Sequence, residues 1–238
     1  MRKIKGSGNY LQNQVRKNLA KAVLSATLFA LIFFSLSLRA LFNLNLDLLA
    51  EIGLLVSLLP LVFFYYYLSK YRIYRGGWEG EKQVIKLLSS KLSDDYFLLD
   101  NLYLRGGAGD IDHVVLAPSG VFVLETKNWN GEIICNGDEW QRKGKRRFKG
   151  SPSRQVKRNL ATIRRIIDSS PTFKALSVHL EGIVIFTNNR ARLHLNNPTV
   201  QIVRLPQLPN LITSTGLSNR FSSEQLEELG KEILNQKI

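Results

Sequence analysis

The sequence predicts an α/β domain, with a mixed central sheet and helices on its faces, that follows a membrane anchor of two apolar helices. Two apolar stretches near the start of the chain predict the anchor, and alternating strand-like and helical patterns after them predict the domain. No low-complexity linker separates a further domain, and 238 residues leave room for one soluble domain beyond the anchor.

The anchor is predicted from Ala22–Leu38 and Ile52–Leu68, two apolar stretches without a charged residue. Each is at the short end of what spans a hydrocarbon core about 30 Å thick. Two alternatives stay open. The first stretch could be a signal peptide, although no small-residue cleavage site follows it, or the two could form a buried helical hairpin in a soluble core.

Lysine and arginine predict the orientation of the anchor. Basic residues crowd before the first stretch and after the second, whereas the segment between them carries only Arg39, Asp47 and Glu51. Cytoplasmic flanks are rich in such residues, so we expect two spans of the cell membrane with both termini in the cytoplasm. Five tyrosines at the exit of the second stretch fit either the lipid headgroup level or ordinary packing: Tyr65, Tyr66, Tyr67, Tyr71 and Tyr74.

Past the anchor, each element is expected from its own pattern. Apolar residues at helical spacing predict a helix over Trp78–Leu92, a second helix is expected near Ser153–Asp168, and the pair Ser222 and Gln225 opens a terminal helix. Apolar and β-branched runs predict strands at Tyr96–Leu102, Ile111–Ala117, Val121–Asn128, Glu132–Cys135, Gly182–Thr187 and Val200–Val203.

Two carboxylates and a lysine are expected on one face of a hairpin. If residues 117–120 form a four-residue turn, the ladder sets Asp112 opposite Glu125, and side-chain alternation places Lys127 on the same face. Burying two like charges side by side stabilises nothing, because each carboxylate resists desolvation and raises the pKa of the other. A divalent cation beside an ammonium group removes that objection. His113 points to the opposite face, where a role in the core or in support of the site residues is expected rather than catalysis.

The helix before the hairpin adds a third carboxylate. Glu81 lies on the apolar stripe of Trp78–Leu92, whereas Glu79 lies on the polar side. Glu81 is therefore expected to face the same site. The alternative is a carboxylate that only interacts with the helix dipole in the first turn.

Several motifs between Gly76 and Asp168 occur in a familiar order. They are Gly77-Trp78-Glu79-Gly80-Glu81, Ile111-Asp112-His113, Pro118-Ser119-Gly120-Val121, Glu125-Thr126-Lys127-Asn128-Trp129, Gly131, Trp140, Pro152 and Gln155. In this order they resemble the nuclease-related domain (NERD) branch of the PD-(D/E)XK nucleases. One departure is Ser151, before Pro152, where the family leads us to expect Asn.

The resemblance implies a restriction-endonuclease-like fold and a metal-dependent nuclease, a phosphodiester hydrolase. Asp112, Glu125 and Glu81 would bind Mg²⁺ or Mn²⁺ through hard oxygen ligands. Lys127 would orient the attacking water or stabilise charge on the phosphate, and Gln155 would orient water or contact the substrate. The expected division is a basic cytoplasmic N-terminus (1–21), the anchor (22–68), the nuclease-like core (76–170) and C-terminal strands and a helix (171–238).

Positive charge indicates the substrate. The net charge is +14, and basic residues gather between the hairpin and the start of the helix that carries Gln155. Such a surface suits a phosphate backbone, so nucleic acid is the expected partner, with DNA as the expected form. Two alternatives are anionic membrane lipid and a solvated loop without a ligand. The basic residues expected to contact nucleic acid are Arg142, Lys143, Lys145, Arg146, Arg147, Lys149, Arg154 and Arg158.

Other catalytic classes lack their motifs. The sequence has no glycine-rich phosphate loop followed by Lys-Ser/Thr, no Gly-x-Ser-x-Gly elbow and, with Cys135 as its one cysteine, no Cys/His zinc spacing. A lone cysteine also agrees with a reducing compartment. The alternatives to an enzyme are a nucleic-acid-binding membrane tether without catalysis and a membrane-bound interaction protein.

Overall fold

The computed structural model describes residues 1–4, 10–41, 48–107, 109–144, 148, 150–215 and 221–237. The side chains of residues 39–41, 48–51, 53 and 54 lie outside this description. The chain divides into two units: Met1–Asn9 with Glu79–Ile238, which holds the sheets, and Tyr10–Trp78, which is helical.

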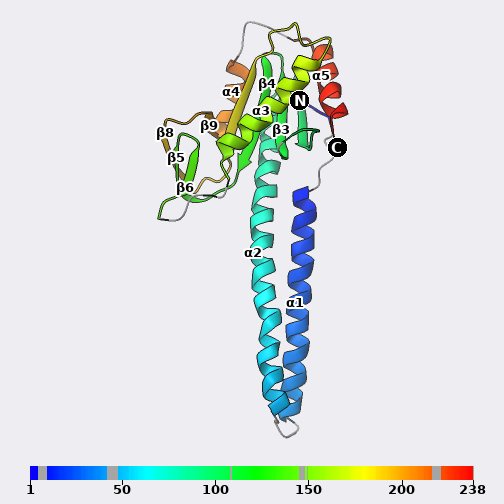
Figure 1. The fold of residues 1–238 in the computed structure, drawn as a ribbon, viewed down its shortest axis with the longest axis vertical. Helices are drawn as coiled ribbons and strands as arrows, with labels where there is room; N and C mark the ends of the chain where they lie inside the picture. Colours follow the sequence, from blue (N-terminus) through cyan, green and yellow to red (C-terminus); the bar gives the residue numbers. More distant parts are fainter. Residues whose placement is uncertain are drawn as a thin grey trace. The chain divides into compact units, whose positions relative to one another are not determined.

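The helical unit consists of α1 and the first part of α2, two long helices that run side by side (Figure 1). α1 covers Tyr10–Leu41, and α2 covers Leu48–Lys91. The ring of Tyr10 on α1 meets that of Tyr74 on α2 edge to face, with centroids 6.5 Å apart. Because α2 begins at Leu48, the helix predicted over Trp78–Leu92 is the last part of a longer helix.

One helical segment among the described residues, Tyr10–Leu38, is long and apolar enough to cross a membrane. Its mean hydropathy is 2.1, and only 6% of its most apolar window is buried. It contains the first apolar stretch that the sequence predicts as a span. The second stretch, Ile52–Leu68, lies within α2, and part of its side chains falls outside the described residues. The two-span arrangement stays a prediction.

Both helices expose large apolar side chains. Leu24 and Phe34 of α1 are 69% and 63% exposed, and Leu55 and Val62 of α2 are 68% and 64% exposed. Apolar surface of this extent is unfavourable in water and marks a contact with lipid or protein. The length and the outward-facing composition of α1 suit membrane association.

The other unit is built on a mixed six-stranded sheet in the order β1-β2-β3-β4-β7-β9. β2, β3 and β4 are antiparallel neighbours, whereas β1 lies parallel to β2 and β7 and β9 continue the sheet in parallel from β4. The strands are β1 (Arg2–Ile4), β2 (Phe97–Leu102), β3 (Ile111–Ala117), β4 (Gly120–Lys127), β7 (Leu180–Phe186) and β9 (Gln201–Arg204).

Helices cover both faces of this sheet (Figure 1). α3 (Pro152–Ser169) and α5 (Ser223–Asn235) pack on one face, and the end of α2 packs with α4 (Leu208–Ser214) on the other; a 3₁₀ turn (Leu205–Gln207) precedes α4. Because both faces are buried, β3 and β4 read as nearly continuous apolar runs. The predicted mixed sheet with flanking helices is confirmed.

A smaller sheet, in the order β6-β5-β8, lies beside the main one (Figure 1). It consists of β5 (Gly131–Asn136), β6 (Glu139–Arg142) and β8 (Ala191–Asn196). The sequence predicts β5, but it does not reveal β6, β8 or β1. These strands are short or mostly exposed, so they lack the apolar runs from which strands are predicted.

His113 lies in the core, where it was expected. The side chain is fully buried, and neither ring nitrogen has a hydrogen-bond partner among the described residues. Burial lowers the pKa of His113 to about 4, because nearby Asp100, which raises the pKa, does not offset the loss of water, and Lys3 lowers it further.

Replacing His113 with Leu should remove much of the acid sensitivity of folding. The folded-state pKa of about 4 lies below the ordinary 6.5, so the unfolded chain binds a proton that the folded chain does not. The contribution to stability is complete above pH 6.5 and declines by about 3 kcal/mol as the pH falls to 4. Thermal unfolding of the full chain in detergent should show a flatter acid limb for His113→Leu; a slope equal to the parent's would contradict this.

Candidate active site

A two-residue turn at positions 118 and 119 sets which residues of β3 and β4 face each other. Ala117 pairs with Gly120, as predicted, and the pairs continue to His113 opposite Leu124. Gly120 has a φ of 147°, and a Cβ there would lie 2.6 Å from the carbonyl oxygen of His179. Only glycine fits this position, so the turn and the register depend on it.

Asp112, the residue before His113, is linked to β4 by a hydrogen bond of its side chain. Its Oδ2 accepts a hydrogen bond of 2.6 Å from the backbone N–H of Thr126. On β4, Glu125 is 1% exposed, and its Oε1 accepts a hydrogen bond from the ammonium group of Lys127. The other oxygen, Oε2, is buried and has no hydrogen-bond partner among the described residues. The structure thus brings Asp112, Glu125 and Lys127 together.

Burial and like charge dominate the electrostatics of this cluster. Burial raises the pKa of Glu125 to about 8, with a further rise from Asp112, while Lys127 and Arg158 act to lower it. The pKa of Asp112 is also raised, again by burial. Burial acts to lower the pKa of Lys127, but the carboxylates of Glu125 and Asp112 outweigh it and leave the pKa raised. Lys127 therefore stays charged at neutral pH.

Glu81, on α2, interacts electrostatically with the same cluster. Its neighbour Gly80 lets the helix come close to the sheet, since a Cβ there would lie 2.9 Å from Oγ1 of Thr187. Glu81 is 7% exposed, and burial raises its pKa to about 9. The acidic residues Asp112, Glu125, Asp100 and Asp110, in that order, raise it further. These groups form one acidic neighbourhood around Lys127.

The donor atoms here fit a hard divalent cation in their chemistry. Carboxylate oxygens are the ligands that Mg²⁺ and Mn²⁺ prefer, and the buried Oε2 of Glu125 lacks a partner among the described residues. A cation would also offset the like charges that raise the pKa values. Within the described part of the chain, however, no three His, Cys, Asp or Glu side chains lie close enough to form a ready metal site.

Helix α3 begins with a capped N-terminus beside the small sheet. The Ser151 hydroxyl accepts a hydrogen bond from the backbone N–H of Arg154, and Pro152 occupies the first helical turn. Ser and Asn are both strong N-cap residues, so the departure at Ser151 preserves the cap. Gln155 follows one turn later and is half-buried, but no hydrogen bond joins its side chain to the carboxylates in the described part of the chain.

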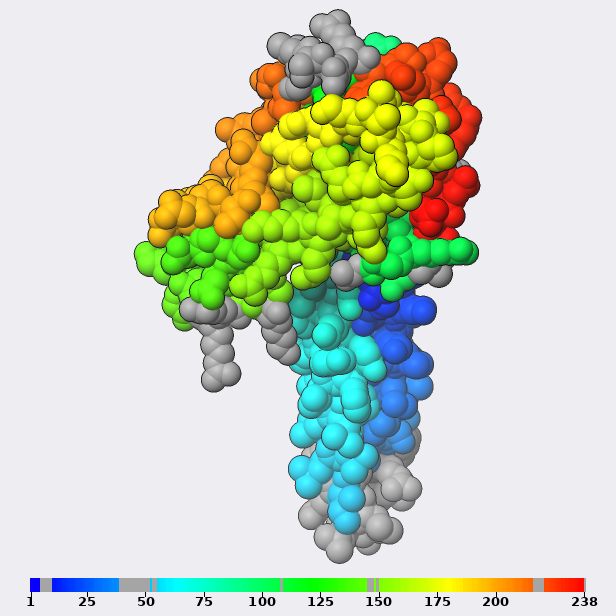
Figure 2. All heavy atoms as spheres, turned by 45° about the horizontal axis from the view of Figure 1, so that its top comes forward, coloured from blue at the N-terminus to red at the C-terminus, as the bar shows by residue number. Residues whose placement is uncertain are grey.

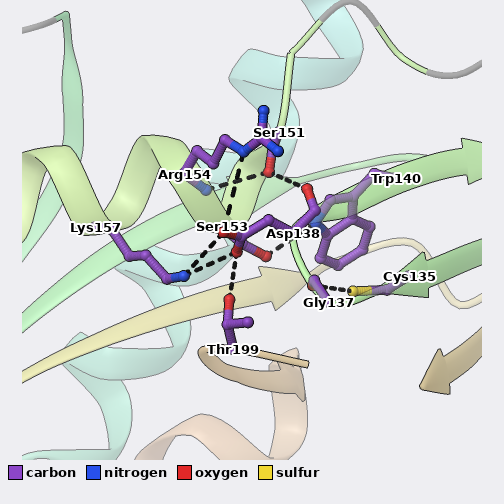
Figure 3. A network of polar contacts seen from close by, with 9 residues as sticks. All are labelled: Cys135, Gly137, Asp138, Trp140, Ser151, Ser153, Arg154, Lys157 and Thr199. Carbon is purple, nitrogen blue, oxygen red and sulfur yellow. Dashed lines mark hydrogen bonds and ion pairs between the residues drawn. The ribbon is translucent and has the colours of Figure 1, made fainter. Parts of the chain in front are cut away.

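A polar network joins α3 to the turn between β5 and β6 (Figure 3). Asp138 accepts hydrogen bonds from Lys157, at 2.9 and 3.0 Å, and from Thr199. Its backbone oxygen accepts one from Ser151, and the buried indole of Trp140 donates to Ser153 at 2.9 Å. The network fixes the small sheet to the first turns of α3.

The described residues of the predicted basic surface have partners of several kinds. Lys143 pairs with Glu132 at 2.8 Å, Arg154 lies 4.0 Å from Asp138, and Arg142 lies over the ring of Phe148. Arg158 is exposed on α3. The remaining four, Lys145, Arg146, Arg147 and Lys149, lie outside the described residues.

The sequence analysis did not single out two residues of this neighbourhood. Asp100 of β2 is 8% exposed and pairs with Lys3 of β1 at 2.9 Å. Asn159 of α3 is buried and donates to the backbone oxygen of Asp110, which holds the segment before β3. An acidic residue inside the apolar run of β2 was a visible signal for Asp100, whereas Asn159 depends on a contact distant in sequence.

Comparison with known proteins agrees with this geometry. Residues 76–187 match the family of the nuclease-related domain. A 60-residue stretch is 45% identical to an uncharacterized protein of Bacillus anthracis and covers 24% of this chain and 28% of that protein. The chain thus spans well under a third of that relative. No solved structure matches the chain significantly.

The mixed sheet with flanking helices, and the acidic residues beside a lysine on β3 and β4, define a nuclease-like α/β domain. The chain carries a domain of the NERD, or nuclease-related domain, family over residues 76–187, as the motifs predicted. The match relates residues 76–187 to nucleases.

The acidic neighbourhood should destabilise the metal-free protein as the pH rises. The pKa values of Glu81 and Glu125, about 9 and about 8, lie above the ordinary 4.5, so the folded chain binds protons that the unfolded chain releases. Their contribution is fully present below pH 4.5 and is lost as the pH rises through 8 and 9. Glu125→Gln should flatten the fall in Tm between pH 5 and 9 in EDTA, whereas the exposed control Asp168→Asn should not. A parental slope in Glu125→Gln would refute the assignment.

Proposed function

We propose that this protein is a membrane-anchored, metal-dependent nuclease that hydrolyses phosphodiester bonds of nucleic acid on the cytoplasmic side of the cell membrane. The observation that carries the proposal is the cluster of Asp112, Glu125 and Lys127 inside a nuclease-related domain. Glu125 is buried, and Asp112 and Lys127 are half-buried. Two carboxylates held this close cost free energy, so their retention together favours a role in chemistry.

Asp112 and Glu125 would hold Mg²⁺ or Mn²⁺, with Glu81 completing the shell directly or through water. The support is the donor chemistry and the shared field of these three carboxylates. When bound, the metal would acidify the attacking water and neutralise oxygens of the scissile phosphate.

The chain's own residues would orient and stabilise the reacting groups. Lys127, charged beside Glu125, would orient the water or stabilise negative charge as it develops on the phosphate. Gln155, on the first turns of α3, would orient water or contact the substrate. Burial of the cluster would strengthen each of these interactions, since it excludes bulk water.

The substrate would be held through its phosphate backbone, with DNA as the expected form. Arg142, Lys143, Arg154 and Arg158, with the basic residues between positions 145 and 149, would supply contacts that do not depend on sequence. The same positive charge would attract anionic lipid headgroups near the membrane.

The proposed topology is two spans with both termini in the cytoplasm. β1, which precedes α1, pairs with β2, which follows α2, in register from Arg2 opposite Phe97 to Ile4 opposite Leu99. Partners in one sheet occupy the same side of any membrane. If α1 crosses it, the chain must therefore cross back before β2, and the apolar stretch Ile52–Leu68 of α2 is the available return.

Catalysis should depend on Lys127 and Asp112. Lys127→Ala should slow cleavage by orders of magnitude with little loss of nucleic-acid affinity, because the proposed work of the ammonium is done on transition-state charge. Asp112→Asn should abolish metal-dependent cleavage, because an amide lacks the charge that holds a hard cation. The measurement is cleavage of labelled DNA and RNA by the full chain in detergent, with Mg²⁺, Mn²⁺ or EDTA.

The outcomes separate the proposed function from its rivals. Asp168→Asn, an exposed change of the same kind, should cleave like the parent. Binding without cleavage by the parent would indicate a nucleic-acid tether, and neither binding nor cleavage would indicate an interaction protein. If Lys127→Ala and Asp112→Asn both cleave like the parent, the activity belongs to another site or to a contaminant.

Topology can be tested independently of activity. Reporters fused before Arg2 and after Ile238 should both report the cytoplasm, and a tag inserted near Asn45 should be accessible from outside. The pairing of β1 with β2 gives the physical reason for the shared location of the termini. Opposite locations for the two fusions would rule out the hairpin.

A further inference from the structure

Helix α3 carries five basic side chains, and four of them are engaged within the described residues. Arg154 and Lys157 face Asp138, Arg164 donates to a backbone oxygen at 3.4 Å, and Arg165 donates to the oxygen of Gly106 at 2.7 Å. Arg158 differs: it is exposed, and the described part of the chain offers its guanidinium no ion pair or hydrogen bond. It is therefore available to an external anion.

Contacts along α3 show what Arg158 faces. Arg165 holds Gly106, and Asn159, nearly two turns towards the helix N-terminus, holds Asp110 at 3.1 Å. The segment that leads into β3 thus runs along α3 towards its N-terminus. Asp112 follows Asp110 by two residues, so we expect it near the turns of α3 that carry Arg158. Residues seven apart share a helix face, so Arg158 projects to the same side as Arg165.

An independent observation agrees with this placement. Val121 and Val123 of β4 pack in the same apolar cluster as Val156 of α3, and alternation along the strand puts Glu125 on that face of the sheet. In Figure 2 the yellow-green atoms of α3 form part of the surface of the molecule.

We propose that Arg158 binds a non-bridging oxygen of the scissile phosphate and is a catalytic residue of the candidate site. This rests on the proposed nuclease function and goes beyond it, since it separates one arginine from a general basic surface. A guanidinium suits the role because its planar fork donates two parallel hydrogen bonds to phosphate oxygens and stays charged at all relevant pH values. It would stabilise the charge that builds up on the phosphate opposite the carboxylates.

The test compares Arg158→Gln with one charge-matched control variant of the full chain in detergent. Lys231→Gln removes an exposed lysine on α5 and should behave like the parent. Arg158→Gln should lower the single-turnover rate at saturating substrate roughly 100- to 1,000-fold. Arg158→Lys should retain part of it, and guanidinium ions should partly rescue Arg158→Ala.

Binding of a labelled oligonucleotide in EDTA gives a second readout without cleavage. Arg158→Gln should reduce the slope of log affinity against log salt by about 0.7 to 0.9, as expected for one lost phosphate contact. A parental rate together with a parental slope in Arg158→Gln would overturn this inference while leaving the nuclease proposal intact. A parent protein that cleaves no nucleic acid would overturn both.

Discussion

The burial of Asp112 and Glu125 beside each other is the constraint on which the candidate site depends. Strand register forces this proximity: the turn at Gly120 fixes the ladder, and Asp112 then takes the backbone N–H of Thr126. A slip of one residue would move the carboxylates to opposite faces of the sheet. Lys127 compensates part of the charge, while burial first and the neighbouring carboxylates second raise the pKa values of Glu81 and Glu125.

The elements around the hairpin serve to hold this cluster. Gly80 permits the close approach of α2 that carries Glu81 inward, and Asn159 of α3 fixes the backbone before Asp112. The Asp138 network secures the first turns of α3 to the small sheet and pairs Lys157 and Arg154 with one carboxylate. β1 adds an edge to the sheet and brings Lys3 to Asp100, so the segment before α1 belongs to the α/β unit. A fragment that begins at Arg75 would lack this strand.

The site hairpin could be predicted because its information is local. A Pro-Ser-Gly turn between two apolar runs sets the register, and alternation then assigns each side chain to a face. The same local logic located the capping box of α5 and the inward side of Glu81. The features that could not be predicted from the sequence depend on contacts between residues far apart in the chain. Three residues of β1 carry no strand signal without β2, and nothing near Lys157 reveals that Asp138 neutralises it. The continuity of α2 was hidden because Gly76 and Gly77 read as a break, although the helix runs through them.

Mn²⁺ binding by the full chain tests the central claim most directly, namely that Asp112 and Glu125 form a metal site. Calorimetric titration at pH 7, repeated in buffers that differ in ionisation enthalpy, measures both affinity and the protons released. The account predicts binding coupled to proton release, because Glu81 and Glu125 carry protons at this pH before a cation displaces them. It also predicts loss of that binding in Asp112→Asn. Parental affinity for Mn²⁺ in Asp112→Asn and in Glu125→Gln would contradict it.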